Sequence, residues 1–290
     1  MDRTVALIVN PAAGAGRAAK RLPDAEAALR ALGIGCHREE TTSLAHAAAL
    51  ALAASEAGEA VFTLGGDGLV GAVAGALADT GTPLGVLPGG RGNDFARVLG
   101  IPSDAAEAVR ALAAAPERKL DLAEANGRPF IGIASCGFDS VANRIANESR
   151  LVKGNLVYLY AALRAVATWK PARFELELDG KLRAYTGWSV AIANSKAYGG
   201  GMRIAPDAEL DDGLFDVVVS ETTSKLAFLR GLPLVFKGTH VDLPSVHVMR
   251  AREVRVSSDR PFELYADGDP VGELPVTVRM RPGALTVLAP

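Results

Sequence analysis

Residues 61–68 read Val-Phe-Thr-Leu-Gly-Gly-Asp-Gly, an apolar run that ends in a loop with almost no side chains. The run predicts a short buried strand, and the residues after it predict a helix that begins near Leu69. Glycines let backbone N–H groups approach an anion, and a helix start adds unpaired donors and the positive end of its dipole. The stretch therefore predicts a phosphate site at the end of a strand.

The carboxylate in this loop, Asp67, indicates what the site would do. A carboxylate repels phosphate unless a divalent cation lies between them, or unless it accepts the proton of an attacking hydroxyl. Both arrangements belong to phosphoryl transfer. The alternative is an ordinary Asp-Gly turn, which needs no function.

Length and composition indicate a soluble globular protein of about two domains. Of 290 residues, 49% are hydrophobic and 22% are charged, and the net charge of −2 argues against nucleic-acid binding. No signal peptide is expected at the start of the chain, and the most apolar long segment, residues 151–169, is interrupted by Lys153 and Arg164. We therefore expect a cytoplasmic protein without a transmembrane helix, in which Cys36 and Cys136 are buried thiols.

The first part of the chain alternates strands with helices. Apolar runs predict strands at residues 5–9, 34–39, 61–64 and 84–87. Helices are expected at residues 17–32, 44–56 and 69–78, the second capped by a hydroxyl of Thr41 or Thr42. Glycine-rich loops follow three of the strands, at residues 10–16, 65–68 and 88–93. Ligands of an open parallel sheet bind beyond the carboxyl ends of its strands, so residues 1–122 are expected to form an α/β nucleotide-binding domain in which these loops meet.

From residue 123 onward the pattern becomes mostly antiparallel. Asn126-Gly127 is a strong hairpin signal, and alternating or turn-bounded runs predict strands at residues 120–125, 128–135, 173–178, 181–193, 214–220, 253–258, 262–266, 275–280 and 285–288. Helices are expected near residues 140–147, 156–168 and 224–236. Residues 123–290 are thus expected to form a β-sandwich domain, with the active site in the cleft between the two domains.

The chain carries several distinct motifs along its length. They are Asn10-Pro11-x-x-Gly14, Gly65-Gly66-Asp67-Gly68, Pro88-x-Gly90-x-Gly92-Asn93-Asp94-Phe95-Ala96-Arg97, the run Tyr198-Gly199-Gly200-Gly201-Met202, the block from Ala205 to Gly213, and Gly238-x-His240. With them the chain resembles, along nearly its whole length, the diacylglycerol kinase catalytic-domain family, which includes bacterial diacylglycerol kinases and sphingosine kinases. The resemblance implies a lipid kinase with MgATP as phosphoryl donor and a membrane lipid hydroxyl as acceptor, foremost diacylglycerol, which would become phosphatidic acid.

The resemblance also implies roles for individual residues. The nucleotide would contact Asn10, Pro11, Ala12, Ala13, Gly14, Thr41, Gly65, Gly66, Asp67, Gly68, Leu69, Val70, Gly71, Ala72, Gly90, Arg91, Gly92 and Asn93. Asp212 would hold Mg²⁺ with the carbonyls of Glu209 and Leu214, and Asp94 and Asp121 could join a metal and water network near the phosphates. The proton acceptor of the family falls on Asp269 of Asp267-Gly268-Asp269, and Asp67 is the second catalytic candidate. His240 is expected to be structural.

The chain departs from the family pattern at a few positions. Leu69 replaces Thr, Gly71-Ala72 replaces Asn-Glu, and Asp269 replaces Glu with a carboxylate that is one methylene shorter. Arg91 replaces Thr, and its guanidinium could pair with a phosphate as a bidentate donor.

Other functions remain open at this point. One alternative is a sphingoid-base or other lipid kinase. Another is an NAD(P)-dependent oxidoreductase, because Gly14-x-Gly16-x-x-Ala19 fits a loose dinucleotide pattern and Glu39 or Glu40 could bind the ribose. A third is an NAD kinase-like enzyme that shares the GGDG loop, and a fourth is an inactive lipid-binding protein.

The expected partners are ATP and a lipid at the membrane surface, with no nucleic acid, and a homodimer is left open. The segment from Arg144 to Arg173 is rich in cations and aromatic residues and has a single acid, Glu148. We expect it to dock the enzyme on the inner membrane face as a peripheral protein.

Overall fold

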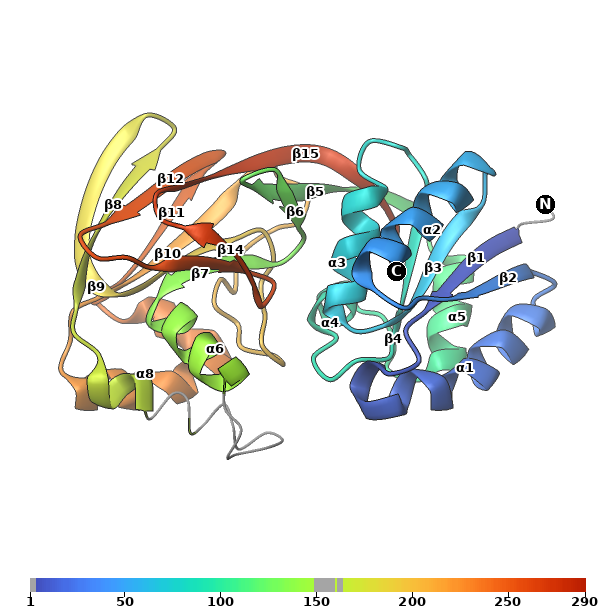
Figure 1. Cartoon of the computed structure of the whole chain (residues 1–290), viewed down its shortest axis with the longest axis horizontal. Coiled ribbons are helices and arrows are strands. Elements are labelled where there is room, and N and C mark those ends of the chain that lie inside the picture. Colours follow the sequence, from blue (N-terminus) through green and yellow to red (C-terminus); the bar gives the residue numbers. More distant parts are fainter. Residues whose placement is uncertain (1–3, 149–159, 161–163) are drawn as a thin grey trace.

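The computed structural model describes residues 4–148, 160 and 164–290, and they form two domains side by side (Figure 1). The first domain has a parallel sheet in the order β4-β3-β1-β2. These strands are β1 (Thr4–Val9), β2 (Gly35–Glu40), β3 (Ala60–Gly65) and β4 (Leu84–Pro88). Helices α1 (Ala13–Ala31) and α5 (Ala105–Ala114) pack together on one face, and α2 (Leu44–Glu56) and α3 (Asp67–Ala76) on the other. The α/β part of the fold prediction is confirmed.

Two helix starts differ from the expectation. The cap of α2 is Ser43, whose Oγ accepts the His46 N–H at 3.1 Å. Thr41 instead donates its hydroxyl to the carbonyl of Ser43 at 2.6 Å, so it positions the cap rather than serving as one. Helix α3 begins at Asp67 and not near Leu69. The GGDG carboxylate therefore lies in the first turn of the helix, where the helix dipole favours negative charge.

The second domain is built mostly from antiparallel strands, as expected. Its elements in chain order are β5 (Glu117–Ala125), β6 (Arg128–Phe130), β7 (Ile133–Gly137), α6 (Phe138–Glu148), β8 (Ala172–Leu178), β9 (Lys181–Ala193), β10 (Phe215–Glu221), α8 (Lys225–Lys237), the 3-10 turn η1 (Thr239–Asp242), β11 (Val246–Ala251), β12 (Glu253–Ser258), β13 (Glu263–Ala266), β14 (Asp269–Glu273) and β15 (Val276–Leu288). Strands β11 and β14 were not predicted. A core of aromatic and aliphatic side chains around Trp188 and Phe174 fills this domain.

One predicted strand of the second domain is wrong in its extent. The expected strand at residues 128–135 is broken into β6 and β7. The N–H groups of Ile131, Gly132 and Ile133 donate to the carboxylate of Asp267 at 2.9, 3.0 and 3.1 Å. Because these donors are taken by a side chain, they do not continue a ladder, and the chain turns between the two strands.

A long two-stranded ribbon joins the domains. Strands β5 and β15 pair antiparallel from Val278↔Ala125 to Leu288↔Glu117 (Figure 1). The two strands expected at residues 275–280 and 285–288 are thus one strand. Its end pairs parallel with β4 at Val287↔Leu84, and residues 284–289 pack in the core of the first domain. The expected domains, residues 1–122 and 123–290, did not anticipate that the end of β15 returns to the first domain.

Three further expectations concerned membrane-spanning helices, the two cysteines and the segment from Arg144 to Arg173. No helix in the described part of the chain is long and apolar enough to cross a membrane. Cys136 is buried, as expected, but Cys36 is exposed, because β2 is an edge strand whose side chains mostly face solvent. Most of the helix expected at residues 156–168, and much of the segment from Arg144 to Arg173, lies outside the described residues.

Candidate active site

The glycine-rich loops of the first domain touch one another. The Gly89 N–H donates to the Gly65 carbonyl at 2.7 Å. A Cβ added at Gly90 would lie 2.4 Å from the Cα of Gly66, and one added at Gly14 would lie 2.5 Å from the Gly89 carbonyl oxygen. No real side chain fits at such distances, so the loops can approach this closely only because these residues are glycines. The predicted convergence of the three loops is therefore present in the structure.

Side chains hold the loop after β4 in place. The Asn93 amide accepts the Gly90 N–H at 2.7 Å and donates to the Gly90 carbonyl at 3.1 Å, with Asn93 itself in the left-handed region at φ 50°. Arg17 on α1 donates to the Gly90 carbonyl at 2.7 Å, and Arg21 donates to the Pro88 carbonyl. The loop is thus fixed from both sides before any ligand binds.

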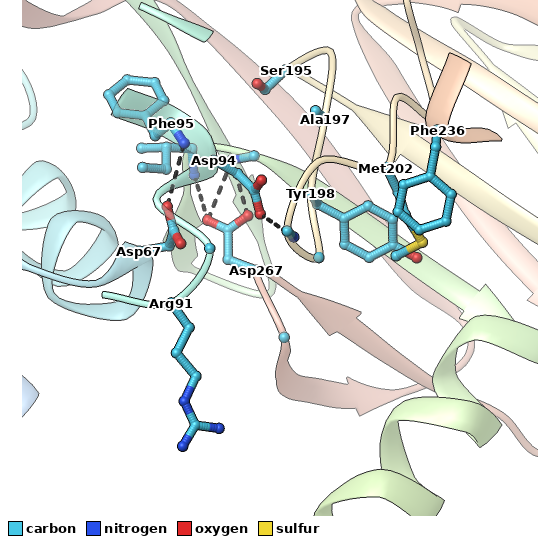
Figure 2. Close-up of a pocket in the computed structure, with 16 residues that line it drawn as sticks. Asp67, Arg91, Asp94, Phe95, Ser195, Ala197, Tyr198, Met202, Phe236 and Asp267 are labelled. Carbon is cyan, nitrogen blue, oxygen red and sulfur yellow. Dashed lines mark hydrogen bonds between the residues drawn. The ribbon is translucent and has the colours of Figure 1, made fainter. Parts of the chain in front are cut away.

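A cavity of about 560 Å³ lies between the two domains, next to these loops. The first domain lines it with Asp67, Arg91, Gly92, Asp94 and Phe95. The second domain contributes Ile131, Gly132, Ser195, Ala197, Tyr198, Gly199, Gly200, Met202, Phe236, Asp267 and Gly268. Figure 2 shows the carboxylates on one side of this group and the rings of Tyr198 and Phe236 with Met202 on the other.

Three carboxylates face the cavity. Asp67 accepts the Phe95 N–H at 3.3 Å, and burial together with the charge of Asp94 raises its pKa. Asp94 pairs with Arg97 at 2.8 Å and accepts the N–H of Gly200 at 2.7 Å, so it joins the loops of the two domains across the cleft. Asp267 comes from the β13–β14 turn of the second domain. The cavity therefore carries an excess of negative charge on its polar side.

Asp267 has an unusual environment for a turn residue. Burial of its carboxyl group raises its pKa to about 6, against the three N–H donors from residues 131–133, which favour the charged form. The charge of Asp67 raises it further.

Asp269, which the family pattern predicts as proton acceptor, lies elsewhere. It begins β14, its side chain is 49% exposed, and it pairs with Arg128 at 2.9 Å. It is not among the residues that line the cavity. The hairpin turn separates the two acids of the motif, because Asp267 takes a left-handed φ of 50° and turns toward residues 131–133 while Asp269 follows the strand.

The other predicted residues are distributed around the cavity rather than all within its lining. Arg91 lines it, but its guanidinium extends away from the three acids (Figure 2). Gly14 lies against Gly89 and Gly90 of the loop after β4, and Thr41 supports the start of α2. Asp121 is buried and accepts the N–H groups of Gly213 and Gly283 at 2.6 and 2.7 Å. It therefore ties the inter-domain ribbon to the loop before β10 and does not reach the cavity.

The carboxylate of Asp212, predicted to hold Mg²⁺ with the carbonyls of Glu209 and Leu214, is paired with an arginine. The Arg250 guanidinium pairs with the carboxylate of Asp212 and lies 3.8 Å from that of Asp216. Its positive charge therefore already neutralises these acids. The other Asp212 oxygen accepts the Leu214 N–H of its own turn at 3.0 Å. No cluster of three or more His, Cys, Asp or Glu side chains in the described residues is arranged to hold a metal.

One polar group on the second-domain side was missed from the sequence. Asp139, at the start of α6, is hydrogen-bonded to the side chains of Ser189 and Tyr198, and burial raises its pKa to about 6. Tyr198 is bonded to Ser135 as well, and burial raises its pKa well above the usual value. This network fixes the Tyr198 ring on the cavity wall. The only sequence signal was the glycine run after Tyr198.

Comparisons with known families agree along the chain. The profile of the family described as "Diacylglycerol kinase catalytic domain" matches residues 4–125. The profile described as "YegS C-terminal NAD kinase beta sandwich-like domain" matches residues 132–289.

Curated relatives cover the chain almost end to end. A diacylglycerol kinase of Mycobacterium tuberculosis is 36% identical over 99% of this chain and 95% of its own length. A diacylglycerol kinase of Bacillus subtilis is 30% identical over 74% of this chain and 72% of its own. One from Staphylococcus aureus is 26% identical over 100% and 93%.

Solved structures show the same fold. The crystal structure of a diacylglycerol kinase from Bacillus anthracis superposes with a TM-score of 0.76 at 22% identity, covering 100% of this chain and 97% of that one. A second solved protein of the same strain superposes with a TM-score of 0.84 at 24% identity, over 100% and 95% of the two chains.

Proposed function

This chain belongs to the diacylglycerol kinase family and is a kinase, and we propose that it transfers the γ-phosphate of ATP to the free hydroxyl of diacylglycerol. The acceptor oxygen would bond to the γ-phosphorus as the bond from that phosphorus to the β–γ bridging oxygen breaks. ADP would leave, and phosphatidic acid would be the lipid product.

The observation that supports this proposal best is the two-sided cavity. One side is lined by residues of the loop after β4 and by Asp67 at the start of α3, next to the glycine loops, whose backbone N–H groups suit phosphates. The opposite wall carries Tyr198, Met202 and Phe236, which suit the apolar body of a lipid. Asp67 from the first domain and Asp267 from the second line the same cavity, and we expect a hydroxyl and a phosphate to meet there.

We assign the proton acceptor to Asp67. Backbone N–H groups of Phe95, Asn93 and Asp94 interact with its carboxylate, the Phe95 bond being long at 3.3 Å. The three N–H groups that donate to Asp267 are closer, at 2.9 to 3.1 Å. The raised pKa of Asp67 makes it a better base than an ordinary carboxylate. Asp267 is then a positioning residue, because it shapes the turn between β6 and β7 and faces the base.

The negative charge on the polar side favours a divalent ion that arrives with ATP. Asp67, Asp94 and Asp267 face one cavity; of the two nearby cations, Arg91 points away from the acids and Arg97 is paired with Asp94. Triphosphate would be repelled there unless a cation came with it. We propose that Asp94 holds Mg²⁺ bound with ATP, an ion that would neutralise charge on the phosphates during transfer. The loops would orient the phosphates, and the closed cleft would exclude water.

The test is phosphate transfer from γ-labelled ATP to defined acceptors, analysed by mass spectrometry of the products. We expect label in phosphatidic acid when diacylglycerol is supplied, and no label transfer to sphingosine. A folded protein that labels sphingosine but not diacylglycerol would contradict the choice of lipid. A protein that labels no lipid would contradict the proposal as a whole.

One finding favours a second acceptor. The profile that matches residues 132–289 is described by its likeness to the β-sandwich of NAD kinase. NAD should therefore be included among the acceptors. We expect no NADP to form, because the wall that faces the carboxylates is lined by Tyr198, Met202 and Phe236 rather than by partners for a second nucleotide.

A further inference from the structure

Helix α8 is apolar along its length but lies at the surface. Its sequence is KLAFLRGLPLVFK, with three cations and no acid, and none of its residues is buried. Its inner face rests on the domain through Phe228, which stacks on Trp188 at 3.9 Å and meets Phe138 of α6 at 4.8 Å. The two helices lie at the same end of the second domain in Figure 1. The inner contacts leave the other face of α8 to solvent.

The outer face combines exposed apolar side chains with cations. Leu226 is 57% exposed and Phe236 is 58% exposed. Leu226, Arg230 and Lys237 follow each other at helical spacing, so they share one face. Lys225 is exposed too, but its ammonium group donates to the Ala167 carbonyl at 2.6 Å. Phe236 is the only aromatic residue among the exposed large hydrophobic side chains of the described chain. A helix with this pattern is typical of one that lies in a membrane interface.

The same helix borders the proposed active site. Phe236 lines the cavity together with Met202. The end of α8 is held at the cavity by the Arg203 N–H, which donates to the Val235 carbonyl at 3.0 Å, and by Gly238 in the left-handed region. A bilayer that covered the outer face of α8 would therefore lie against the opening of the apolar wall.

We propose that α8 is the surface by which this protein docks on an anionic lipid bilayer, with Leu226 inserted between the lipids, Phe236 at the border between the bilayer and the cavity, and Arg230 and Lys237 at the headgroups. The proposal rests on the proposed function in one respect, namely that the acceptor is a lipid. The positive charge of α8 favours an anionic bilayer over a second copy of the chain as the partner of this face. A second copy of the chain, docked through the same face about a two-fold axis, would bring like charges together, whereas anionic headgroups complement them.

The test is sedimentation of the full chain with vesicles of equimolar phosphatidylglycerol and phosphatidylcholine, and with vesicles of phosphatidylcholine alone. The variant is Leu226→Gln with Arg230→Gln, both exposed and outside the cavity lining. The matched control is Leu182→Gln with Arg183→Gln at the β8–β9 hairpin, where Leu182 is 72% exposed. This hairpin and α8 lie at opposite ends of the second domain in Figure 1. Both variants lose one leucine and one arginine.

We expect the wild type to sediment with the anionic vesicles and not with phosphatidylcholine alone. The α8 variant should lose at least about tenfold in partitioning, of which the removed cation accounts for about fivefold, while the hairpin control binds like the wild type. Equal binding of the α8 variant and the wild type would overturn the proposal. The proposal would also be overturned if the wild type did not bind vesicles but formed a dimer in analytical ultracentrifugation, and if the α8 variant did not form that dimer.

A kinase assay separates this proposal from the function itself. With monomeric dioctanoylglycerol in solution, the α8 variant should phosphorylate the acceptor at the wild-type rate. With long-chain diacylglycerol in anionic vesicles, it should be slower in proportion to its lost binding. If no lipid is phosphorylated in either assay, the proposed function fails, and the vesicle sedimentation still decides whether α8 docks.

Discussion

The two walls of the cavity are made in different ways. On the first-domain side, the loops beside the cavity meet through their backbone: Gly89 and Gly90 approach the loop at Gly65 and Gly66 so closely that a Cβ on either would collide with it. The first-domain residues that line the cavity itself are Asp67, Arg91, Gly92, Asp94 and Phe95. The wall in the second domain is made of side chains from segments far apart in the sequence, such as Ile131, Tyr198, Phe236 and Asp267. We infer that the first wall can hold one kind of ligand, a polyphosphate, whereas the second can change its ligand by exchanging side chains.

The largest expected effect comes from the group between the walls. Asp67→Asn keeps the shape of the side chain but removes the base, so kcat should fall about 10³-fold, within the usual range for a general base. Asp269→Asn is the matched control, because it removes one carboxylate from the neighbouring hairpin, and it should lower kcat less than about tenfold. The measurement is steady-state lipid phosphorylation by both variants. The reverse order of effects would return the role of base to Asp269.

The next effect tests the backbone wall. In Gly90→Ala the new Cβ meets the Cα of Gly66 at 2.4 Å, so the two loops must separate. A displacement of this size should cost about 100-fold in kcat/KM for ATP. Gly231→Ala in α8 is the control, since its Cβ would meet only Leu243 at an ordinary 3.7 Å. If Gly90→Ala bound ATP normally in calorimetry, the loops would not be the phosphate wall.

A smaller effect tests the side-chain wall. Phe236→Ala removes an exposed ring from the cavity without opening the core, so the melting temperature should not change. The KM for diacylglycerol should rise about tenfold, the order expected for loss of apolar contact area, while the KM for ATP stays the same. An equal rise in both constants would mean that Phe236 acts on the fold and not on the acceptor.

Sequence predicted the first wall better than the second for a physical reason. Loops after parallel strands meet at one sheet edge, and glycines mark them in the sequence, so residues 65–68 and 88–93 could be placed together beforehand. The second wall depends on how distant segments fold onto each other. Nothing local in residues 128–135 showed that three N–H groups would turn to Asp267 and split the strand.

Charge pairing was equally hidden from sequence patterns. The acids around Asp212 suit a cation, but only the register of β10 and β11, which sets Asp216 opposite Arg250, shows that an arginine supplies it. The choice between Asp267 and Asp269 is similar. They stand on either side of one glycine, and the hairpin geometry alone determines which of them faces the cleft.

The arginine pair gives a stability prediction outside the walls. Arg250→Met should leave the carboxylate of Asp212 without its partner and lower the free energy of unfolding by about 1–3 kcal/mol. Chelation by EDTA should not change the melting temperature of the ATP-free wild type, since an arginine already occupies the site. A wild type that melts at a lower temperature in EDTA would contradict this and restore the metal to Asp212. Denaturant unfolding and differential scanning fluorimetry supply the two readouts.

The smallest effect concerns pH. Asp67 must be ionised to accept a proton, so kcat/KM should rise with pH and then level off. Burial first, and the charge of Asp94 second, raise the pKa of Asp67, so this rise should occur at higher pH than for an ordinary carboxylate. Asp94→Asn removes the repulsion and should move the rise to lower pH. An unchanged or upward-shifted profile would show that another group titrates.

The central claim is that the two walls bind different substrates. Hydrogen exchange of the full chain, followed by mass spectrometry, tests it with each substrate added alone. We expect MgATP to slow exchange in residues 65–68 and 88–93, and dioctanoylglycerol to slow it in residues 195–202 and 234–238. Protection of the second set by MgATP, with no change in the first, would contradict the account.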